Sequence, residues 1–309
     1  MTTPVFVDGA AGTTGLEIVA RLEAHPEFEP LVLDEAHRKD VNARREALND
    51  TPFAVLCLPD DAAREAVALV DPSSKTRIVD ASSAHRVADG WTYGFPEIIG
   101  RDRIAQAARV SNPGCYPTGF LGLVAPLVRA GLLPADWPFT VNAVSGYSGG
   151  GKALIERFDN EPDIAFRAYG LTLDHKHLPE MQAHAGLEHP VLFAPSVVPA
   201  FRGMLVEVPL HLGAMATEPH ADALRDVLAE FYESSPVVNL ERDTAVSELL
   251  LQRDAMPDDS MTLRVFGNEG GWNARLIAVL DNLGKGASGA AIQNLNLMAG
   301  FAETASLRL

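Results

Sequence analysis

The sequence contains only two cysteines, Cys57 and Cys115, among its 309 residues. Because they lie in unlike surroundings, we expect no disulfide framework, and we predict a reducing cytoplasm as the compartment. The chain also lacks an apolar run of membrane-spanning length. Its first residues carry neither the basic segment nor the apolar segment of a secretory signal. We therefore expect no membrane partner.

Basic residues are scarce as well. Lys and Arg number 25 against 41 Asp and Glu, which gives a formal net charge of −16. Binding of nucleic acid depends on neutralising phosphates with a basic face, so this balance argues against a nucleic-acid partner. Any anionic ligand must instead be attracted by local arginines, lysines and backbone N–H groups. The hydrophobic fraction of 47% and the length are those of a globular protein with room for two domains.

The first third of the chain alternates strand and helix patterns. Apolar runs and helical spacing predict strands at residues 4–7, 31–34, 53–58 and 77–80, and helices at residues 16–24, 44–48 and 60–70. Such alternation is typical of a parallel sheet with right-handed crossovers. We therefore predict an α/β protein that begins with a Rossmann-type dinucleotide-binding domain.

A glycine-rich turn, GAAGTTG at residues 9–15, follows the first of these strands. Small residues at a strand-to-helix turn let the backbone approach a pyrophosphate, and the helix N-terminus supplies N–H groups. The turn thus predicts a dinucleotide site. Its spacing is GxxGxxG rather than the commoner GxGxxG, and a turn of purely structural use is the alternative.

Residues after the second predicted strand affect the choice between NAD and NADP. Asp34 lies near the position where an acidic residue binds a ribose 2′-hydroxyl, which favours NAD. Arg38 and Lys39 follow it and could instead hold a 2′-phosphate. The residues alone leave both cofactors open.

The stretch SNPGCYPT at residues 111–118 contains the second cysteine. Since Pro113 and Pro117 are expected outside a helix, the cysteine is predicted on a turn that opens into one. A helix N-terminus favours thiolate over thiol, so Cys115 is a candidate nucleophile. The alternative is a small buried apolar residue, which is what we expect Cys57 to be.

Two further polar stretches are candidates for binding. DASSAHR, at residues 80–86, follows a strand at the edge where open α/β sheets bind ligands, so Arg86 could grip a phosphate or carboxylate or be an ordinary surface arginine. If residues 171–177 are extended, His175 and His177 face the same side. A metal site that includes His184 lacks the HExxH spacing, so we expect no metal. The alternative is that His175 and His177 are ordinary surface histidines.

The pattern changes from about residue 120, where several strands follow one another without a helix in every gap. This order predicts an α+β second domain. Residues 146–152 match the start of a P-loop, but Ala153 lacks the hydroxyl that would hold Mg²⁺. A P-loop phosphotransferase and a non-catalytic dinucleotide sensor remain alternatives to a cysteine-dependent enzyme.

Five stretches taken together resemble one known family. They are GAAGTTG at residues 9–15, SNPGCYPT at 111–118, SGYSGGGK at 145–152, HKHLPE at 175–180 and KGASG at 285–289. In this order, from one end of the chain to the other, they look like N-acetyl-γ-glutamyl-phosphate reductase in its shorter form, a relative of aspartate-semialdehyde dehydrogenase. The aspartate relatives carry an Asn-Cys-Thr context, whereas this chain has Gly-Cys-Tyr-Pro, which favours the N-acetylglutamyl substrate.

The resemblance implies an NADP-dependent reduction of N-acetyl-glutamyl 5-phosphate to the semialdehyde in arginine biosynthesis, through a thioester on Cys115. It implies an imidazole acid/base at His175 or His177, of which we favour His177. The implied substrate contacts are Arg86, Tyr169, Glu180, Ser145 and Lys152. The implied cofactor contacts are Gly9, Gly12, Thr13, Thr14, Gly15, Arg38, Ser82, Asn282 and Gly286.

The resemblance also implies a domain plan. We expect an NADP-binding domain over residues 1–115 and an α+β catalytic and oligomerisation domain over residues 116–283. Residues 284–309 are expected to form a C-terminal helix that returns to the first domain. A homodimer or homotetramer is the expected assembly.

Overall fold

The computed structural model describes residues 2–309, which form two compact units. The first unit comprises the chain up to Gly114 together with Ala287–Arg308, and the second comprises Cys115–Gly286 with Leu309. The chain therefore passes from the first unit to the second inside the SNPGCYPT stretch, immediately before the cysteine.

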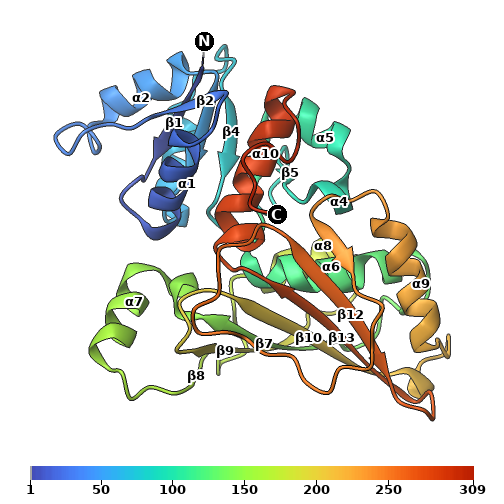
Figure 1. The fold of residues 1–309 in the computed structure, drawn as a ribbon. Coiled ribbons are helices and arrows are strands. Elements are labelled where there is room, and N and C mark those ends of the chain that lie inside the picture. Colours follow the sequence, from blue (N-terminus) through green and yellow to red (C-terminus); the bar gives the residue numbers. More distant parts are fainter. Residues whose placement is uncertain (1) are drawn as a thin grey trace. The chain divides into compact units, whose positions relative to one another are not determined.

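The first unit is built on a six-stranded sheet of order β2-β1-β3-β4-β6-β5, in which every pairing is parallel (Figure 1). The predicted Rossmann-type parallel sheet is confirmed. The elements of this unit are β1 (Thr3–Asp8), α1 (Thr13–Glu23), β2 (Phe28–Leu31), α2 (Val41–Asp50), β3 (Phe53–Leu56), α3 (Asp60–Ala68), β4 (Arg77–Asp80), β5 (Thr92–Tyr93), α4 (Pro96–Ile99), α5 (Arg101–Gln106), β6 (Arg109–Ser111) and α10 (Gly289–Ala299).

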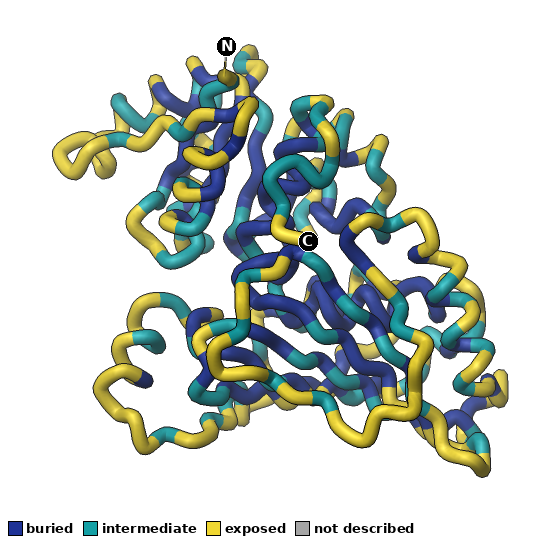
Figure 2. Tube along the Cα trace, in the orientation of Figure 1, coloured by how far each residue is buried: buried dark blue, intermediate teal, exposed yellow. Residues whose placement is uncertain are grey.

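Side chains on the two faces of this sheet form separate apolar cores. In β1, Val5 and Val7 belong to the core that contains Ile18 of α1. Phe6, which lies between them in sequence, belongs to the other core with Leu48 of α2. This is the period-two alternation of a strand. Both faces are covered, and the central strands are buried along their length (Figure 2).

The C-terminal helix α10 is part of the first unit. Ile292 and Leu295 of α10 lie in the same core as Val79 of β4, and the helix also packs against α5 (Figure 1). Residues more than 200 positions apart in sequence therefore complete one core. A hydrogen bond from Asn294 Nδ2 to the carbonyl oxygen of Gly94 likewise joins residues 200 positions apart.

The second unit contains a seven-stranded mixed sheet of order β11-β12-β13-β10-β7-β9-β8. Strand β10 pairs antiparallel with β7 and β13, whereas β7 and β9 pair in parallel, so the predicted α+β organisation is confirmed. The main elements of this unit are α6 (Cys115–Arg129), β7 (Thr140–Gly146), α7 (Gly151–Asn160), β8 (Arg167–Ala168), α8 (Leu178–Ala185), β9 (Leu192–Val198), β10 (Met204–His211), α9 (Ala221–Tyr232), β11 (Val238–Leu240), β12 (Met261–Gly267) and β13 (Asn273–Leu280).

Helix α6 is the buried element of the second unit. It packs against β10 and β13, and all residues from Tyr116 to Leu127 are buried. Gly119 lies so close to the sheet that a Cβ on it would stand 2.7 Å from Val206 Cγ2. Because the helix is held so closely, its first residue, Cys115, has a fixed place at its N-terminus.

The prediction that Pro117 lies outside the helix is wrong. Pro117 occupies the first turn of α6. The first N–H groups of an α-helix have no partner within it, so a proline there removes no intrahelical hydrogen bond.

The predicted strand at residues 31–34 is wrong beyond its first residue, because β2 comprises Phe28–Leu31 and shares only Leu31 with the predicted range. Asp34 instead accepts a hydrogen bond from the backbone N–H of His37, which is 2.9 Å from Asp34 Oδ1. Aspartate side chains commonly close turns in this way. The carboxylate therefore belongs to a turn after the strand rather than to the strand itself.

The conditional prediction that residues 171–177 are extended is also wrong. Gly170 and Leu173 have φ angles of 65° and 59°, and the N–H of Leu173 donates to Gly170 O. Two left-handed residues make the chain turn, so His175 and His177 lie on a loop before α8.

Within residues 2–309, none of the helices combines the length and apolar character needed to cross a bilayer.

Candidate active site

The glycine turn between β1 and α1 is shaped by two close approaches. Gly9 has a φ of 87°, and a Cβ on it would stand well inside 3.0 Å of the carbonyl oxygen of Cys57. A Cβ on Gly15 would come equally close to the carbonyl oxygen of Gly9. Gly12 is different, because the nearest atom to a Cβ there would be 3.7 Å away. The turn is thus tight at its two ends and open at Gly12.

Helix α1 begins at Thr13, with Gly12 as its N-cap. Among the residues that the structure describes, no side chain caps this end of the helix. The first N–H groups, those of Thr13, Thr14 and Gly15, also lack partners within the helix, and the helix dipole favours negative charge there. A glycine turn followed by such an end fits the pyrophosphate of a dinucleotide.

Asp34 and Arg38 both have partners on their own turn. Asp34 Oδ1 lies 2.7 Å from His37 Nδ1, and the hydrogen bonds from His37 lower the pKa of Asp34. Arg38 makes a two-pronged contact with Glu35, with Nε 2.7 Å and Nη2 2.6 Å from its carboxylate oxygens. A 2′-phosphate bound by Arg38 would compete with Glu35.

A hydrogen-bonded cluster follows β4. Ser82 donates to Asp80 from its backbone N–H and from its hydroxyl, at 2.9 and 2.7 Å. His85 Nδ1 lies 2.6 Å from Asp80 Oδ2, and the imidazole stacks on Trp91 with ring centroids 4.2 Å apart. Asp80 is fully buried. The cluster fixes the loop that contains Ser82 and Arg86.

Arg86 is buried, with 8% of its surface exposed. Its Nε donates to the carbonyl oxygen of Asn112 at 3.0 Å, and its Nη2 lies 3.4 Å from the carbonyl oxygen of Ala81. The alternative of an ordinary surface arginine is therefore wrong. The guanidinium is tied to the segment that leads to Cys115.

Cys115 is the first residue of α6 and is partly buried. A Cβ on Gly286 would stand 2.9 Å from Cys115 Cβ and 3.1 Å from the carbonyl oxygen of Asp281. The predicted cofactor residue Gly286 is thus a close backbone neighbour of the thiol. A larger residue at 286 would press on the candidate nucleophile.

Aromatic and imidazole rings gather around Tyr116, the residue after the cysteine. Tyr169 Oη lies 3.1 Å from Tyr116 Oη, and Tyr116 Oη lies 3.3 Å from the carbonyl oxygen of Ser196. The rings of His175 and His177 are centred 6.2 and 5.9 Å from that of Tyr116. Burial raises the pKa of Tyr169 to about 12 and that of Tyr116 well above its usual value. Both phenols therefore stay protonated at neutral pH.

The two histidines differ in how their rings are held, although their centroids are only 4.7 Å apart. The backbone N–H of His177 donates to His175 Nδ1 at 3.2 Å. His175 Nδ1 is then an acceptor, which fixes the neutral tautomer with its proton on Nε2. His177 is buried and caps α8, and Glu180 in the first turn of that helix is 1% exposed.

The stretch that resembles a P-loop does not have the form of one. After β7, the N–H groups of Tyr147 and Ser148 donate to Ala200 O and Phe201 O, at 2.9 and 3.1 Å, so they are not available to cradle phosphates. Lys152, in α7, is exposed. The P-loop interpretation is therefore wrong.

Ser145 and Asn282 are buried in the second unit. The Ser145 hydroxyl lies 3.0 Å from the carbonyl oxygen of Gly146. Asn282 donates from Nδ2 to Ser148 Oγ, and its Oδ1 accepts from the N–H of Gly203, each at 2.9 Å. The amide that we predicted to contact the cofactor thus joins two loops of this unit.

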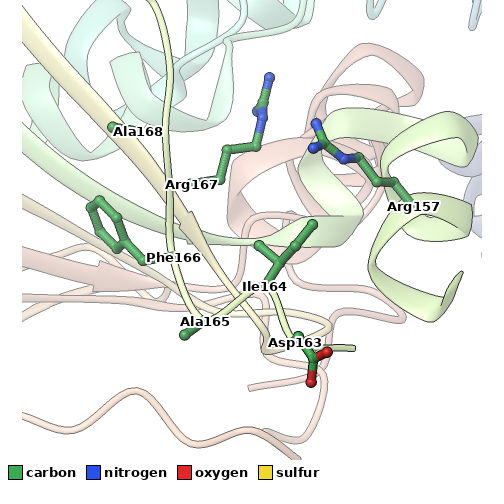
Figure 3. A pocket seen from close by; sticks show the side chains of 7 residues that line it. All are labelled: Arg157, Asp163, Ile164, Ala165, Phe166, Arg167 and Ala168. Atoms are coloured by element: carbon green, nitrogen blue, oxygen red, sulfur yellow. The ribbon is translucent and has the colours of Figure 1, made fainter. Parts of the chain in front are cut away.

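A cavity of about 650 Å³ opens between α7 and β8, lined by Arg157, Asp163, Ile164, Ala165, Phe166, Arg167 and Ala168 (Figure 3). It is separate from the predicted site residues. Its link to them is Arg167, whose guanidinium carbon lies 4.4 Å from the centre of the Tyr169 ring. Across the part of the chain that the structure covers, no group of three or more His, Cys, Asp or Glu is placed to hold a metal ion.

The sequence predicted no role for Tyr116 or Asn112, and it included Asn294 only as one end of the range from Asn282 to Asn294 in which cofactor contacts are implied. Tyr116 joins the phenol pair, and Asn294 of α10 donates a hydrogen bond to Asn112, which lies in the segment before Cys115. Asn294 left a signal, since it is a polar residue inside the apolar run of the last helix. Asn112 left none beyond its place in the SNPGCYPT stretch.

Two family models match successive parts of the chain. Residues 4–107 match the semialdehyde dehydrogenase NAD-binding domain, and residues 115–282 match the semialdehyde dehydrogenase dimerisation domain. Among solved structures, aspartate semialdehyde dehydrogenase II from Vibrio cholerae superposes with a TM-score of 0.71 at 18% identity, over 97% of this chain and 99% of that one. At this identity the likeness shows a shared fold.

Full-length relatives are more similar in sequence. N-acetyl-gamma-glutamyl-phosphate reductase 2 of a Nostoc species is 46% identical over 98% of each chain. N-acetyl-gamma-glutamyl-phosphate reductase of Brucella ovis is 46% identical over 97% of this chain and all of its own, at 100%. The resemblance inferred from the five stretches is confirmed. The chain belongs to the N-acetyl-gamma-glutamyl-phosphate reductase family, built from the two semialdehyde dehydrogenase domains.

Proposed function

We propose that the protein reduces N-acetyl-glutamyl 5-phosphate to N-acetyl-glutamate 5-semialdehyde and phosphate, with NADPH as the reductant, in arginine biosynthesis. The names of the 46% identical relatives support the substrate. The observation that carries the chemistry is the position of Cys115 at the N-terminus of α6, in the same unit as two histidines that pack on its neighbour Tyr116.

The thiol would act as the nucleophile. Cys115 Sγ forms a bond to the acyl carbon, the carbon–oxygen bond to phosphate breaks, and phosphate leaves with the electron pair. NADPH would supply the hydride that converts the resulting thioester into a hemithioacetal. The hemithioacetal then collapses as an imidazole takes up its hydroxyl proton, the carbon–sulfur bond breaks, and Cys115 leaves as thiolate while the aldehyde forms. The N–H groups at the start of α6 would stabilise the negative oxygen of the tetrahedral species.

An imidazole would transfer protons to and from the reacting groups. The hydrogen bond accepted by His175 Nδ1 favours His177 for this role. As base it takes the proton of Cys115, and as acid it gives a proton to the oxygen that becomes negative on hydride transfer. His175 would have to break its hydrogen bond from the His177 N–H before Nδ1 could take up a proton. We assign the acid/base role to His177 and a supporting role to His175.

The remaining polar residues would hold the ends of the substrate. Arg86 carries a planar guanidinium suited to a phosphate or carboxylate. Lys152 would add positive charge, and Ser145, Tyr169 and Glu180 would contact the acyl chain. The Tyr169 hydroxyl proton points to Tyr116, because Tyr116 must donate its own to Ser196 O, so Tyr169 would accept a hydrogen bond from a substrate N–H.

The cofactor would bind along the glycine turn. Gly9, Gly12, Thr13, Thr14 and Gly15 fit the pyrophosphate, as argued above. We place the 2′-phosphate at Arg38 and further contacts at Ser82, Asn282 and Gly286. We prefer NADP over NAD because Arg38 could bind the 2′-phosphate. Its hydrogen bond to Glu35 would have to break first.

A reactive thiol requires a reducing compartment, so we place the enzyme in the cytoplasm. The second unit matches a domain described as a dimerisation domain, which supports a homo-oligomer, either a dimer or a tetramer. Sedimentation of the purified chain measures that number.

The reverse reaction tests the proposed function. The wild type should reduce NADP⁺ with N-acetylglutamate semialdehyde, and the rate should depend on inorganic phosphate. Aspartate semialdehyde is the control substrate and should react far more slowly. Turnover with the aspartate compound alone would assign the other substrate. NADPH binding without turnover of either would mean a dinucleotide sensor and overturn the proposal.

A further inference from the structure

Asn112 is a buried residue whose four polar groups are all engaged. Its backbone N–H donates to the carbonyl oxygen of Asp80 at 2.7 Å, and its own carbonyl oxygen accepts from Arg86 Nε at 3.0 Å. Its side-chain Nδ2 donates to Ala287 O at 2.9 Å, and its Oδ1 accepts from Asn294 Nδ2 at 3.2 Å. One residue thus joins the end of β4, the loop that carries Arg86, helix α10 and Ala287, which lies two residues before that helix.

Asn294 supports this arrangement from α10. It is fully buried, and its Nδ2 also donates to the carbonyl oxygen of Gly94 at 2.9 Å. A Cβ on Gly94 would stand 2.5 Å from that nitrogen, so glycine is needed for the approach. Over residues 2–309, Asn294 Oδ1 has no hydrogen-bond partner. A buried oxygen without a partner destabilises the helix that carries it. We therefore attribute the Asn294 side chain to its hydrogen bonds with Asn112 and Gly94 rather than to the packing of α10.

The segment held in this way leads directly to the nucleophile. Only Pro113 and Gly114 separate Asn112 from Cys115. Proline restricts both its own φ and the conformation of the residue before it, so a fixed Asn112 defines how the chain approaches α6. The Asn112 carbonyl oxygen at the start of this short connection also accepts from Arg86 Nε.

We propose that Asn112 is a positioning residue that holds the Arg86 side chain and the residues immediately before Cys115 in one arrangement, with Asn294 as its support. The assignment goes beyond the residues that the family resemblance implied. It rests on the proposed function for the roles of Arg86 and Cys115. Its consequence is that the two asparagines, neither of which touches the reacting atoms, affect both phosphate affinity and thiol reactivity.

Two variants test the proposal, Asn112→Ala and Asn294→Ala, with Asn296→Ala as the matched control. Asn296 is a buried asparagine of the same helix, and it bonds to His25, Glu303 and Ala305 instead. All three variants should lose stability. Only the first two should slow alkylation of Cys115 by iodoacetamide at pH 7, by about tenfold, and move its pH profile to higher pH. They should also raise the KM for phosphate in the reverse reaction, whereas Asn296→Ala should change neither.

Alkylation is followed by mass spectrometry of the Cys115 peptide, in folded protein and without substrate. This arm remains decisive even if N-acetylglutamate semialdehyde proves not to be a substrate. The double variant Asn112→Ala/Asn294→Ala should react no more slowly than the slower single variant, because the two residues act as one unit. An unchanged alkylation profile in Asn294→Ala, or the same change in Asn296→Ala, would overturn the proposal. Asn294→Ala keeps it testable if Asn112→Ala does not fold.

Discussion

Each unit of the protein contains one cysteine, and the two thiols are placed in opposite ways. Cys57 follows β3 in the first unit, next to the glycine turn, and its N–H donates to the carbonyl oxygen of Asp8 at 2.7 Å. Burial, with Asp80 and Asp8 nearby, raises the pKa of the Cys57 thiol to about 12. Cys115 begins α6, where the helix dipole favours the anion. The two positions therefore support a structural role for Cys57 and the nucleophilic role that we propose for Cys115.

One histidine of each unit, His25 in the first and His175 in the second, makes a parallel comparison. The backbone N–H of Glu27 donates to His25 Nδ1 at 3.1 Å, just as that of His177 donates to His175 Nδ1. His25 Nε2 then lies 3.0 Å from Asn296 Oδ1, so both of its nitrogens are used within the fold. His175 resembles this structural histidine in its Nδ1 hydrogen bond. The comparison therefore favours His177 for the acid/base role that we propose.

The largest expected difference is between the two cysteines. Cys115→Ser should lower kcat by about 10³-fold or more, because the hydroxyl is a far weaker nucleophile, while NADPH binding persists. Cys57→Ser should retain nearly full kcat. Steady-state assays and NADPH fluorescence titrations measure the two quantities. Near-normal turnover of Cys115→Ser would remove the covalent route, and an equal loss in Cys57→Ser would show that the comparison itself fails.

The histidines should differ by a smaller factor. His177→Asn should reduce kcat by about 10²-fold or more, as loss of a general acid/base does. His175→Asn should cost about tenfold at most, because an asparagine Oδ1 can accept the same N–H two residues on. The pH profile of kcat distinguishes them, since only His177→Asn should remove a limb. The reverse order of effects would make His175 the acid/base.

Much of the fold was predictable because its apolar patterns are strong. The strand predicted at residues 77–80 has the bounds of β4, and the strand predicted at residues 4–7 lies within β1. Both have clear periodicity and clear ends. The strand predicted at 31–34 failed because Asp34 closes a turn, and the extended stretch at 171–177 failed because Leu173 adopts a left-handed conformation. A leucine gives no sequence signal for positive φ.

The candidate site was predictable only in part. Cys115 and the histidine pair stood out because their residue types carry chemistry. The positioning role that we propose for Asn112 and Asn294 was not predictable, because it depends on a contact across 182 residues of sequence. The stretch that ends at Lys152 failed in the opposite way. Its residue spacing matches that of a P-loop, but its backbone does not have the conformation of one. Local patterns indicate which side chains are candidates for chemistry, whereas the groups that we propose to hold them are brought together by tertiary structure.

The glycine turn beside Cys57 should separate structural from binding effects. Gly9→Ala should destabilise the protein by roughly 2–4 kcal/mol, because it combines a positive φ with a clash against the carbonyl oxygen of Cys57. Gly12→Ala should cost less than about 1 kcal/mol, because a Cβ fits there, but should weaken NADPH binding where the backbone must approach the pyrophosphate. Urea unfolding and fluorescence titration measure these. Unchanged NADPH affinity in Gly12→Ala would place the pyrophosphate elsewhere.

The smallest expected effect concerns His25 and pH. Burial lowers the pKa of His25 in the folded protein, so the unfolded chain binds more protons over the acidic range. The stability contributed by neutral His25 should therefore be present above about pH 6.5 and lost as the pH falls below it. Relative to His25→Asn, which does not titrate at this position, the wild type should lose about 1 kcal/mol of unfolding free energy between pH 8 and pH 5.

His189→Asn, a change at an exposed histidine of the second unit, is the control and should keep the wild-type dependence of stability on pH. Parallel urea midpoints for wild type and His25→Asn across that range would show that His25 is not the structural histidine that the comparison requires.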